Sequence, residues 1–420
     1  MIRKKGMVFR ALLGAVVVLL LGGCSIGPTL LKTDYIQYNI SVQEGFRKEM
    51  LLNLVRVRHL ETPFFLQVGA ISSTHQFSNS IGGTANTPDK RYPLLGIVPT
   101  FGLTLNNTVG ETPTVTYMPL SGEKYVQRIL GDFKMDDFFS LYDSGWNSVM
   151  RILLFVLMEQ IGDLKYQLDT DEVEPVSLSK LVTLVDLLSQ IYMRGDLKIS
   201  VVEGESILLS NQISGKEVNS SAIIAADRGG YYYRSTGNGN YELRKKSGLR
   251  YVMLMQYRNA QEADKVDSLL GIKSKMKGTG MKGLKRAVEL STVEIPEEEN
   301  RKRDIPAVFI DFRSFQQVLT DLSAGIDLPD SSEQSWDGSE APVTNPAPNP
   351  FRDAIRPIFH VKCSSVAPSA FLSVFYRGNW FYIDNADISS KITFDLVEIL
   401  FSLKSAASQI QTPTLTIPVR

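Results

Sequence analysis

The stretch FLSVFYRGNWFYID, residues 371–384, is the clearest fold signal in the sequence. Two runs rich in aromatic and β-branched residues flank Gly378-Asn379, a dipeptide typical of a two-residue hairpin turn. With the turn at these residues, two pairs form an apolar face beside Leu372: Tyr376 with Phe381, and Val374 with Ile383. The opposite face holds four aromatic or basic side chains, which we take as a possible interaction surface: Phe375, Arg377, Trp380 and Tyr382.

A helix follows this hairpin. Asp387 is a suitable N-cap, and the apolar spacing continues to about Lys404. The predicted buried stripe consists of five residues: Ile392, Leu396, Ile399, Leu400 and Leu403. The run TLTIPV, residues 414–419, could add an edge strand, where its proline is tolerated. Residues 351–420 are therefore expected to form a compact ββα unit.

Upstream, residues 41–60 show the spacing of an amphipathic helix. Its apolar stripe contains Val42, Phe46, Met50, Leu54 and Val57, widened by Leu51 and Val55. Thr62-Pro63 ends this helix, because the residue before a proline avoids the α region. Residues 64–118 are rich in Ser, Thr, Asn and Gly. Within this segment small polar residues alternate with apolar ones, which predicts strands on either side of a loop near residues 82–93.

The middle of the chain alternates between helical and strand patterns. Residues 121–192 are predicted to be helical, and residues 197–328 to contain several short strands. The last predicted helix of the first region buries Leu181, Leu184, Val185, Leu188 and Ile191. Two segments are predicted to be loops. Residues 273–304 carry charges in blocks, and residues 329–350 have the Pro-, Ser- and acid-rich composition of disordered linkers. The main region, residues 41–328, is thus α+β, with amphipathic helices and antiparallel β-meanders.

The composition narrows the functional classes. Hydrophobic residues make up 43% of the chain and charged residues 21%, as in an ordinary globular protein, and the formal net charge is zero. A balance of this kind argues against nucleic acid as the main partner.

The N-terminal segment has the layout of an export signal. Four basic residues precede or adjoin the apolar run ALLGAVVVLLL at residues 11–21, which is long enough for only about half of a bilayer core. The run ends in Leu21-Gly22-Gly23-Cys24, which resembles the lipobox of bacterial lipoproteins. This resemblance implies cleavage after residue 23 and lipidation of Cys24, because in that family the cysteine thiol accepts a diacylglycerol.

The same resemblance predicts a location. Ser25 follows the cysteine, where an aspartate would favour retention in the inner membrane, so the outer membrane and its periplasmic side are expected. Residues 24–40 would form a lipidated tether, and two or three acyl chains give stable anchoring. Cleavage removes four basic and no acidic residues, leaving 41 basic and 45 acidic side chains, or about −4. Cys363 is then left without an intramolecular disulfide partner.

Three further segments resemble a group of uncharacterised outer-membrane lipoproteins of Gram-negative bacteria. They are MLLNLVRVRHLETPFFL at 50–66, PTVTYMPLSGEKYVQRIL at 113–130, and SVFYRGNWFYIDNADISSKITFDLVEILFSL at 373–403. A shorter match is Arg313-Ser314-Phe315. The resemblance supports the anchor and the fold boundaries, and it implies no activity.

Motifs of catalysis and cofactor binding lack their required context. Residues 278–283 (GTGMKG) match G-x-G-x-x-G, but the polar stretch IKSKMK precedes them instead of a buried strand. His59, His75 and His360 are far apart in the sequence, and no metal-ligand spacing surrounds them. The sequence therefore predicts neither a cofactor nor a metal site, and it offers no recognisable catalytic set.

These observations favour a lipoprotein that acts through protein partners as a structural or assembly component of the envelope, and not as an enzyme. Two alternatives stay open. The alternation in residues 64–118 would suit membrane-spanning strands, which need about nine to eleven residues each, so several protomers could form an oligomeric channel or a secretion-system ring. The other alternative is an envelope hydrolase of an unrecognised type. The oligomeric state is not predicted by the sequence.

Overall fold

The computed structural model describes residues 26–86, 100–165, 175–204, 207–245, 248–273, 284–329 and 350–405. The fold class is α+β, as predicted. The chain forms two compact units: one holds the segment up to Asn53 and Thr62–Gly122, and the other holds Leu54–Glu61 and Glu123–Arg420. The ββα segment at the C-terminus thus belongs to the larger unit. Cys24, the G-x-G-x-x-G match, residues 330–349 of the predicted linker and the TLTIPV run lie outside the described residues.

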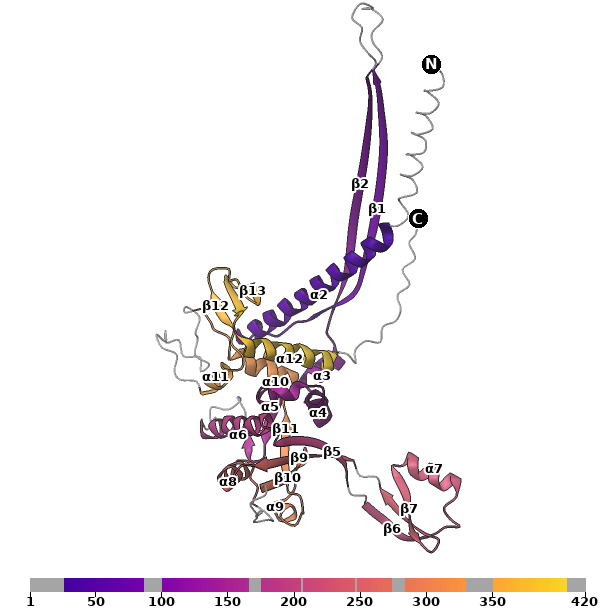
Figure 1. Ribbon diagram of the computed structural model, residues 1–420, viewed down its shortest axis with the longest axis vertical. Coiled ribbons are helices and arrows are strands. Elements are labelled where there is room, and N and C mark those ends of the chain that lie inside the picture. The colour runs from indigo at the N-terminus through magenta and orange to yellow at the C-terminus, as the bar shows by residue number, and fades with distance from the viewer. Residues whose placement is uncertain are drawn as a thin grey trace, which may run out of the picture. The chain divides into compact units, whose positions relative to one another are not determined.

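Helix α2 (Ile26–Arg58) begins much earlier than the expected residue 41 (Figure 1). Most of the predicted tether, residues 24–40, is therefore helical. The spacing of apolar residues did not predict this part of the helix, because that spacing indicates a buried face and side chains such as Tyr35 and Ile40 are exposed. The predicted stripe is confirmed from Met50 onward, where Met50, Leu54 and Val57 are buried.

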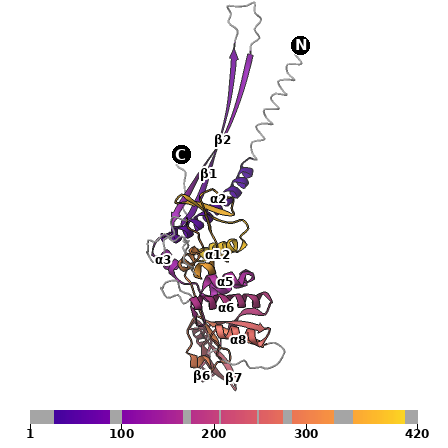
Figure 2. The same cartoon turned by 90° about the vertical axis from the view of Figure 1, so that its left-hand side faces the viewer.

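Strands β1 (Leu66–Asn86) and β2 (Thr100–Pro119) form a two-stranded antiparallel ribbon, which runs side by side along its length in both views (Figures 1 and 2). The pairing runs from Leu66↔Pro119 to Asn86↔Thr100, with one irregularity between Val68 and Ala70. The sequence predicted strands here but not their length. Alternation of polar and apolar residues is weak near Gly82-Gly83, where we expected the loop to begin.

The base of the ribbon is held by side chains of α2. Asn53 donates through Nδ2 to the carbonyl oxygen of Phe64 (2.8 Å) and accepts from the Phe64 N–H through Oδ1 (2.9 Å). The Leu66 N–H donates to Oε1 of Glu49 (2.6 Å). Asn53 is fully buried. Its side-chain amide bonds both backbone groups of Phe64, as the peptide groups of a neighbouring strand would, in the segment between α2 and β1.

The larger unit contains a mixed six-stranded sheet. Every neighbouring pair is antiparallel except β10–β11, so the expectation of antiparallel meanders is wrong for that pair. In spatial order the strands are β4 (Leu164–Lys165), β3 (Met158–Ile161), β11 (Ala307–Phe312), β10 (Leu284–Ser291), β9 (Leu249–Tyr257) and β5 (Leu197–Glu203).

Two of these strand regions were expected to be something else. Residues 158–165 lie in the predicted helical region but form β3 and β4, because pairing with β11 overrides local preference. Residues 284–291 lie in the predicted charged loop, residues 273–304, yet form the interior strand β10. Its buried charges are neutralised in place: Arg286 pairs with Asp267, and Glu289 pairs with Arg303 at 2.5 Å. This strand was not predicted because its segment carries charged residues in blocks, which are typical of a loop.

Helices cover this sheet. Phe138 of α4 contacts Phe312 of β11 with ring centroids 5.8 Å apart, and α6 contacts α5, α8 and strands β4, β5 and β9. All five residues predicted on the buried face of α6 are buried. The helices are α3 (Glu123–Leu130), α4 (Met135–Asp143), the 3-10 helix η2 (Trp146–Val149), α5 (Met150–Leu157), α6 (Pro175–Met193), α8 (Ala260–Leu269), α9 (Glu297–Asn300) and α10 (Phe315–Ser323).

Two smaller sheets complete the unit. The first has the order β6-β8-β7 and carries α7 (Ser220–Arg228); its strands are β6 (Ile207–Ser214), β7 (Tyr231–Gly237) and β8 (Asn240–Lys245). The turn between β7 and β8 has Asn238 and Gly239 both at positive φ, as a tight hairpin turn requires. The second has the order β12-β14-β13, with β12 (Lys362–Ser364), β13 (Leu372–Tyr376) and β14 (Asn379–Ile383), between α11 (Pro350–Ile355) and α12 (Ile388–Ser405) along the chain.

The buried face of α12 differs in part from the predicted stripe. Leu396 and Leu400 are fully buried, but Leu403 is exposed and Phe394 and Val397 are fully buried instead. Apolar residues occur on more than one side of this helix, so spacing alone did not select the buried side. No described helix is both long and apolar enough to cross a membrane.

Arg313 ties three elements together at the end of β11. It is 2% exposed, and its Nη1 donates to the carbonyl oxygens of Phe155 (2.7 Å) and Val156 (3.1 Å) in the last turn of α5. Its Nε lies 2.5 Å from Oδ2 of Asp321 in α10. Burial raises the pKa of Asp321 to about 6, against the lowering effect of Arg313, so the carboxylate is ionised at neutral pH.

We expect Asp321→Ala to lower the free energy of unfolding by about 3–5 kcal/mol, because it leaves the buried Arg313 guanidinium without its counter-charge. Glu297→Ala is the control. It removes an exposed carboxylate paired with Lys273 and Arg301, and should leave the urea midpoint close to that of the wild type, because solvent screens exposed ion pairs. Urea titration of both variants measures the difference, and equal losses would contradict the role assigned to the buried pair.

Candidate functional site

The C-terminal hairpin forms with a register two residues from the predicted one. Val374 pairs with Phe381, and Tyr376 pairs with Asn379, so the turn residues are Arg377 and Gly378. Both have positive φ, +47° and +85°, as a type I′ turn requires. A shift of two preserves the two faces of the strands, and the predicted inner face is confirmed: Leu372, Val374, Phe381 and Ile383 are buried.

Arg377 therefore leaves the predicted aromatic face. Its Nη2 donates to Oε1 of Glu61 (2.5 Å), while the Tyr376 hydroxyl donates to Oε2 of the same carboxylate (2.5 Å). The left-handed backbone is unfavourable for a residue other than glycine, by about 1–2 kcal/mol. The two-pronged contact with Glu61 helps to offset this cost and fixes the turn against the end of α2.

The end of α2 is shaped for this contact. Leu60 also has positive φ (+60°), and the Glu61 N–H returns to the carbonyl oxygen of Arg56 (2.9 Å), which closes the helix. The His59 ring packs 5.8 Å from the Tyr376 ring and 6.0 Å, edge to face, from Phe381. Burial and the charge of Arg377 lower the pKa of His59, although Glu61 acts in the opposite direction.

The remaining three predicted residues do share a face. Phe375 and Trp380 are cross-strand partners with ring centroids 5.3 Å apart, and Phe375 is 57% exposed. Tyr382 lies two residues beyond Trp380 and pairs with Ser373 and Lys362. This outward face, which we call the aromatic surface, consists of Phe375, Trp380 and Tyr382.

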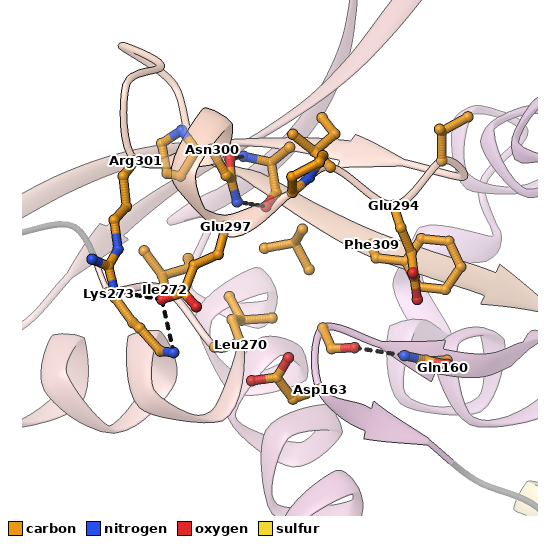
Figure 3. Close-up of a pocket in the computed structure, with 18 residues that line it drawn as sticks. Gln160, Asp163, Leu270, Ile272, Lys273, Glu294, Glu297, Asn300, Arg301 and Phe309 are labelled. Carbon is orange, nitrogen blue, oxygen red and sulfur yellow. Dashed lines mark hydrogen bonds and ion pairs between the residues drawn. The ribbon is translucent and has the colours of Figure 1, made fainter.

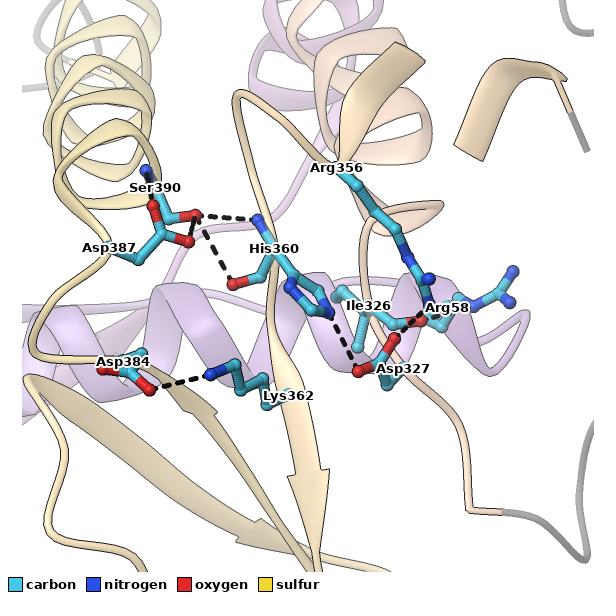
Figure 4. Close-up of polar contacts among 9 residues, drawn as sticks. All are labelled: Arg58, Ile326, Asp327, Arg356, His360, Lys362, Asp384, Asp387 and Ser390. Carbon is cyan, nitrogen blue, oxygen red and sulfur yellow. Dashed lines mark hydrogen bonds and ion pairs between the residues drawn. The ribbon is translucent and has the colours of Figure 1, made fainter. Parts of the chain in front are cut away.

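A polar cluster surrounds Asp327, which follows α10, and draws on the segment between α11 and β12 and on the start of α12 (Figure 4). His360 Nε2 lies 2.9 Å from Asp327 Oδ2, and Arg356 Nη2 donates to Oδ1 of the same carboxylate (2.5 Å). Although burial opposes ionisation, the hydrogen bond from His360 and the neighbouring positive charges hold the pKa of Asp327 below its usual value. Asp327 is therefore a constant anion at neutral pH.

The cluster contains serine, histidine and aspartate, but not in a catalytic arrangement. Ser390 Oγ accepts from the backbone N–H of His360 (2.8 Å) and donates to Asp387 (2.6 Å), whereas the His360 ring points toward Asp327 (Figure 4). Ser390 is also fully buried. A nucleophilic serine needs the imidazole as its base and an approach for the substrate, and this serine has neither. Asp387 caps α12, as predicted, because its Oδ1 accepts from the backbone N–H of Ser390 (3.0 Å).

An open pocket of about 380 Å³ lies between the start of β11 and α9 (Figure 3). Three of its charged groups pair with one another: Glu297 accepts from Lys273 (2.9 Å) and from Arg301 (2.5 Å). Those hydrogen bonds hold the pKa of Glu297 below its usual value. Asn300 is bonded to both backbone groups of Ala307. These contacts organise the loop around α9 and do not converge on a point in the pocket.

Other candidate sites can be placed as follows. Within the ranges that the structure describes, no group of three or more His, Cys, Asp or Glu side chains could hold a metal ion. Cys363 lies in β12 as a half-buried thiol. The sequence singled out neither Glu61 nor the contact of His59 with the hairpin. Their partners are more than 300 residues away in the sequence, and the only local signal was the helix end before Thr62-Pro63.

No known protein family, curated protein or solved structure matches this chain.

The two phenylalanines of the hairpin should respond differently to truncation. Phe381→Ala removes a fully buried ring and should lower the free energy of unfolding by about 3–5 kcal/mol. Phe375→Ala, the matched control on the aromatic surface, should lower it by less than about 1 kcal/mol. Denaturant midpoints measure both, and a large loss from Phe375→Ala would mean that the aromatic surface is part of the core.

Acidification should weaken the contact between α2 and the hairpin. The pKa of His59 is lower in the folded state than its ordinary value of 6.5, so the unfolded chain binds the proton first. The contribution to stability is therefore complete above about pH 6.5 and is lost as the pH falls. His59→Phe keeps an aromatic ring that cannot titrate, and should flatten the stability profile between about pH 7 and 5. Parallel profiles would argue against this role.

Proposed function

We propose that the protein is an outer-membrane lipoprotein, anchored by acyl chains on Cys24 and facing the periplasm, that acts as a structural or assembly component of the envelope. The anchor rests on the sequence Leu21-Gly22-Gly23-Cys24 and on Ser25 after it. The proposed partners are envelope proteins.

The observation that carries the assembly role is the β1–β2 ribbon. It pairs along some 20 residues, and in the described chain each strand has only the other as a neighbour. Each strand therefore presents an outer row of backbone N–H and C=O groups. A two-stranded ribbon is marginally stable in water, and strand addition from a partner would satisfy both rows.

The aromatic surface offers a second contact region, because exposed aromatic side chains are enriched in the centres of protein interfaces. The second candidate function is an oligomeric outer-membrane channel or secretion-system ring, favoured by the difference in residue types between the two sides of the ribbon. The hydrolase alternative can be tested with envelope substrates: turnover abolished by a single polar substitution would overturn the non-enzymatic proposal.

We expect Cys24→Ser to abolish incorporation of labelled palmitate and to release the protein without detergent. Cys363→Ser is the matched control and should keep both the label and the membrane attachment. Ser25→Asp should move the protein to the inner-membrane fraction. Labelling of the Cys24→Ser variant, or recovery of the wild type as a soluble protein, would contradict the anchor.

A further inference from the structure

The register of the ribbon separates two kinds of residue. Beyond the irregularity at Gly69, alternate positions belong to opposite faces. One face is mainly apolar in the half nearer the end of β1, and includes the pairs Phe77–Val109, Ile81–Leu105 and Ala85–Phe101. The other face is small and polar, and includes Ser78–Thr108, Ser80–Asn106 and Gly82–Thr104. The described side chains of this polar face are exposed.

Charge is almost absent from the ribbon. Charged residues make up 21% of the whole chain, but the 21 residues of β1 contain no Asp, Glu, Lys or Arg, and the 20 residues of β2 contain only Glu111. Water-exposed strand edges usually carry charges, especially lysine, which discourage pairing with other chains. This ribbon lacks that protection on both edges.

The length of the apolar band matches a bilayer. Residues 77–86 and 100–109 give about ten residues in each strand, or about 33 Å at 3.3 Å per residue, against about 30 Å for the hydrocarbon core. On one side the band ends at the pair His75–Glu111. On the other, the connecting sequence contains Asp89, Lys90 and Arg91.

We propose that this half of the ribbon inserts into a lipid bilayer as a pair of membrane-spanning strands, flanked on both edges by the same ribbon from other copies of this chain. Its apolar face contacts lipid and its polar face lines a water-filled passage. The inference rests on the proposed outer-membrane location.

Copies of the chain are the fitting neighbours for a physical reason. In lipid every backbone N–H and C=O must be satisfied by protein, so a ribbon with two open edges cannot insert alone. A second copy supplies a strand of the same length, with the same alternation and without charge. The closed arrangement that results keeps all apolar faces outward and all polar faces inward.

Two neighbouring substitutions test the assignment of faces. The full-length acylated protein is reconstituted into phosphatidylethanolamine–phosphatidylglycerol vesicles loaded with a small fluorescent dye. Wild type and Thr104→Lys, with the charge on the polar face, should release the dye. Leu105→Lys, with the same charge on the apolar face, should reduce the release rate at least tenfold, because lysine at the bilayer midplane is strongly unfavourable. Equal rates for the two variants would overturn the proposal.

Fluorescence at the same positions reports insertion directly. In a Cys363→Ser background, an environment-sensitive dye attached at Leu105→Cys should be blue-shifted and quenched by lipid-borne quenchers, whereas the dye at Thr104→Cys should stay accessible to aqueous iodide. Identical behaviour at both positions would contradict the separation of faces.

Flotation of the vesicles separates this proposal from the anchor. If wild-type protein floats with the vesicles but releases no dye and is monomeric in detergent, membrane insertion is overturned and the anchor stands. If Cys24→Ser also floats and releases dye, insertion stands and the lipid is not the sole attachment. If wild-type protein does not float, both proposals fail.

Discussion

The buried pair Arg313–Asp321 is the interaction on which the larger unit depends. A charge at 2% exposure is tolerated only when it is paired and hydrogen-bonded, and here the guanidinium contacts two carbonyl oxygens of α5 and one carboxylate of α10. The same residue donates its backbone N–H to Leu157 and accepts from Phe133. The helix-to-strand change after Leu157, the pairing of β3 with β11 and the start of α10 are therefore fixed around one side chain.

A second constraint joins the end of α2 to the C-terminal hairpin. Glu61 accepts from both Tyr376 and Arg377, and the two segments each hold a residue at positive φ, Leu60 and Arg377. Backbone strain of this kind persists only where surrounding contacts determine it. With the turn and the helix end fixed together, the inner face of the hairpin packs and the aromatic surface is left outward.

Charge is distributed differently in the two sheet systems. Strand β10 carries Arg286 and Glu289 into the interior, because Asp267 and Arg303 neutralise them there. The ribbon β1–β2 has almost no charge although its described polar face is exposed. Paired charges are compatible with a strand whose neighbouring strands belong to its own unit. An uncharged ribbon with two open edges can instead pair with strands of other chains, because no charge on its edges opposes that pairing.

The sequence by itself determined what depends on local spacing: the α+β class, the buried face of α6 and the two faces of the C-terminal hairpin. Only the tertiary structure decided what depends on distant partners. Residues 158–161 became a strand through β11, residues 284–291 through ion pairs, and the turn moved to Arg377-Gly378 beside Glu61. Local patterns record burial and propensity, but an ion pair or a strand neighbour supplied by another element of the fold leaves no periodic trace in the sequence.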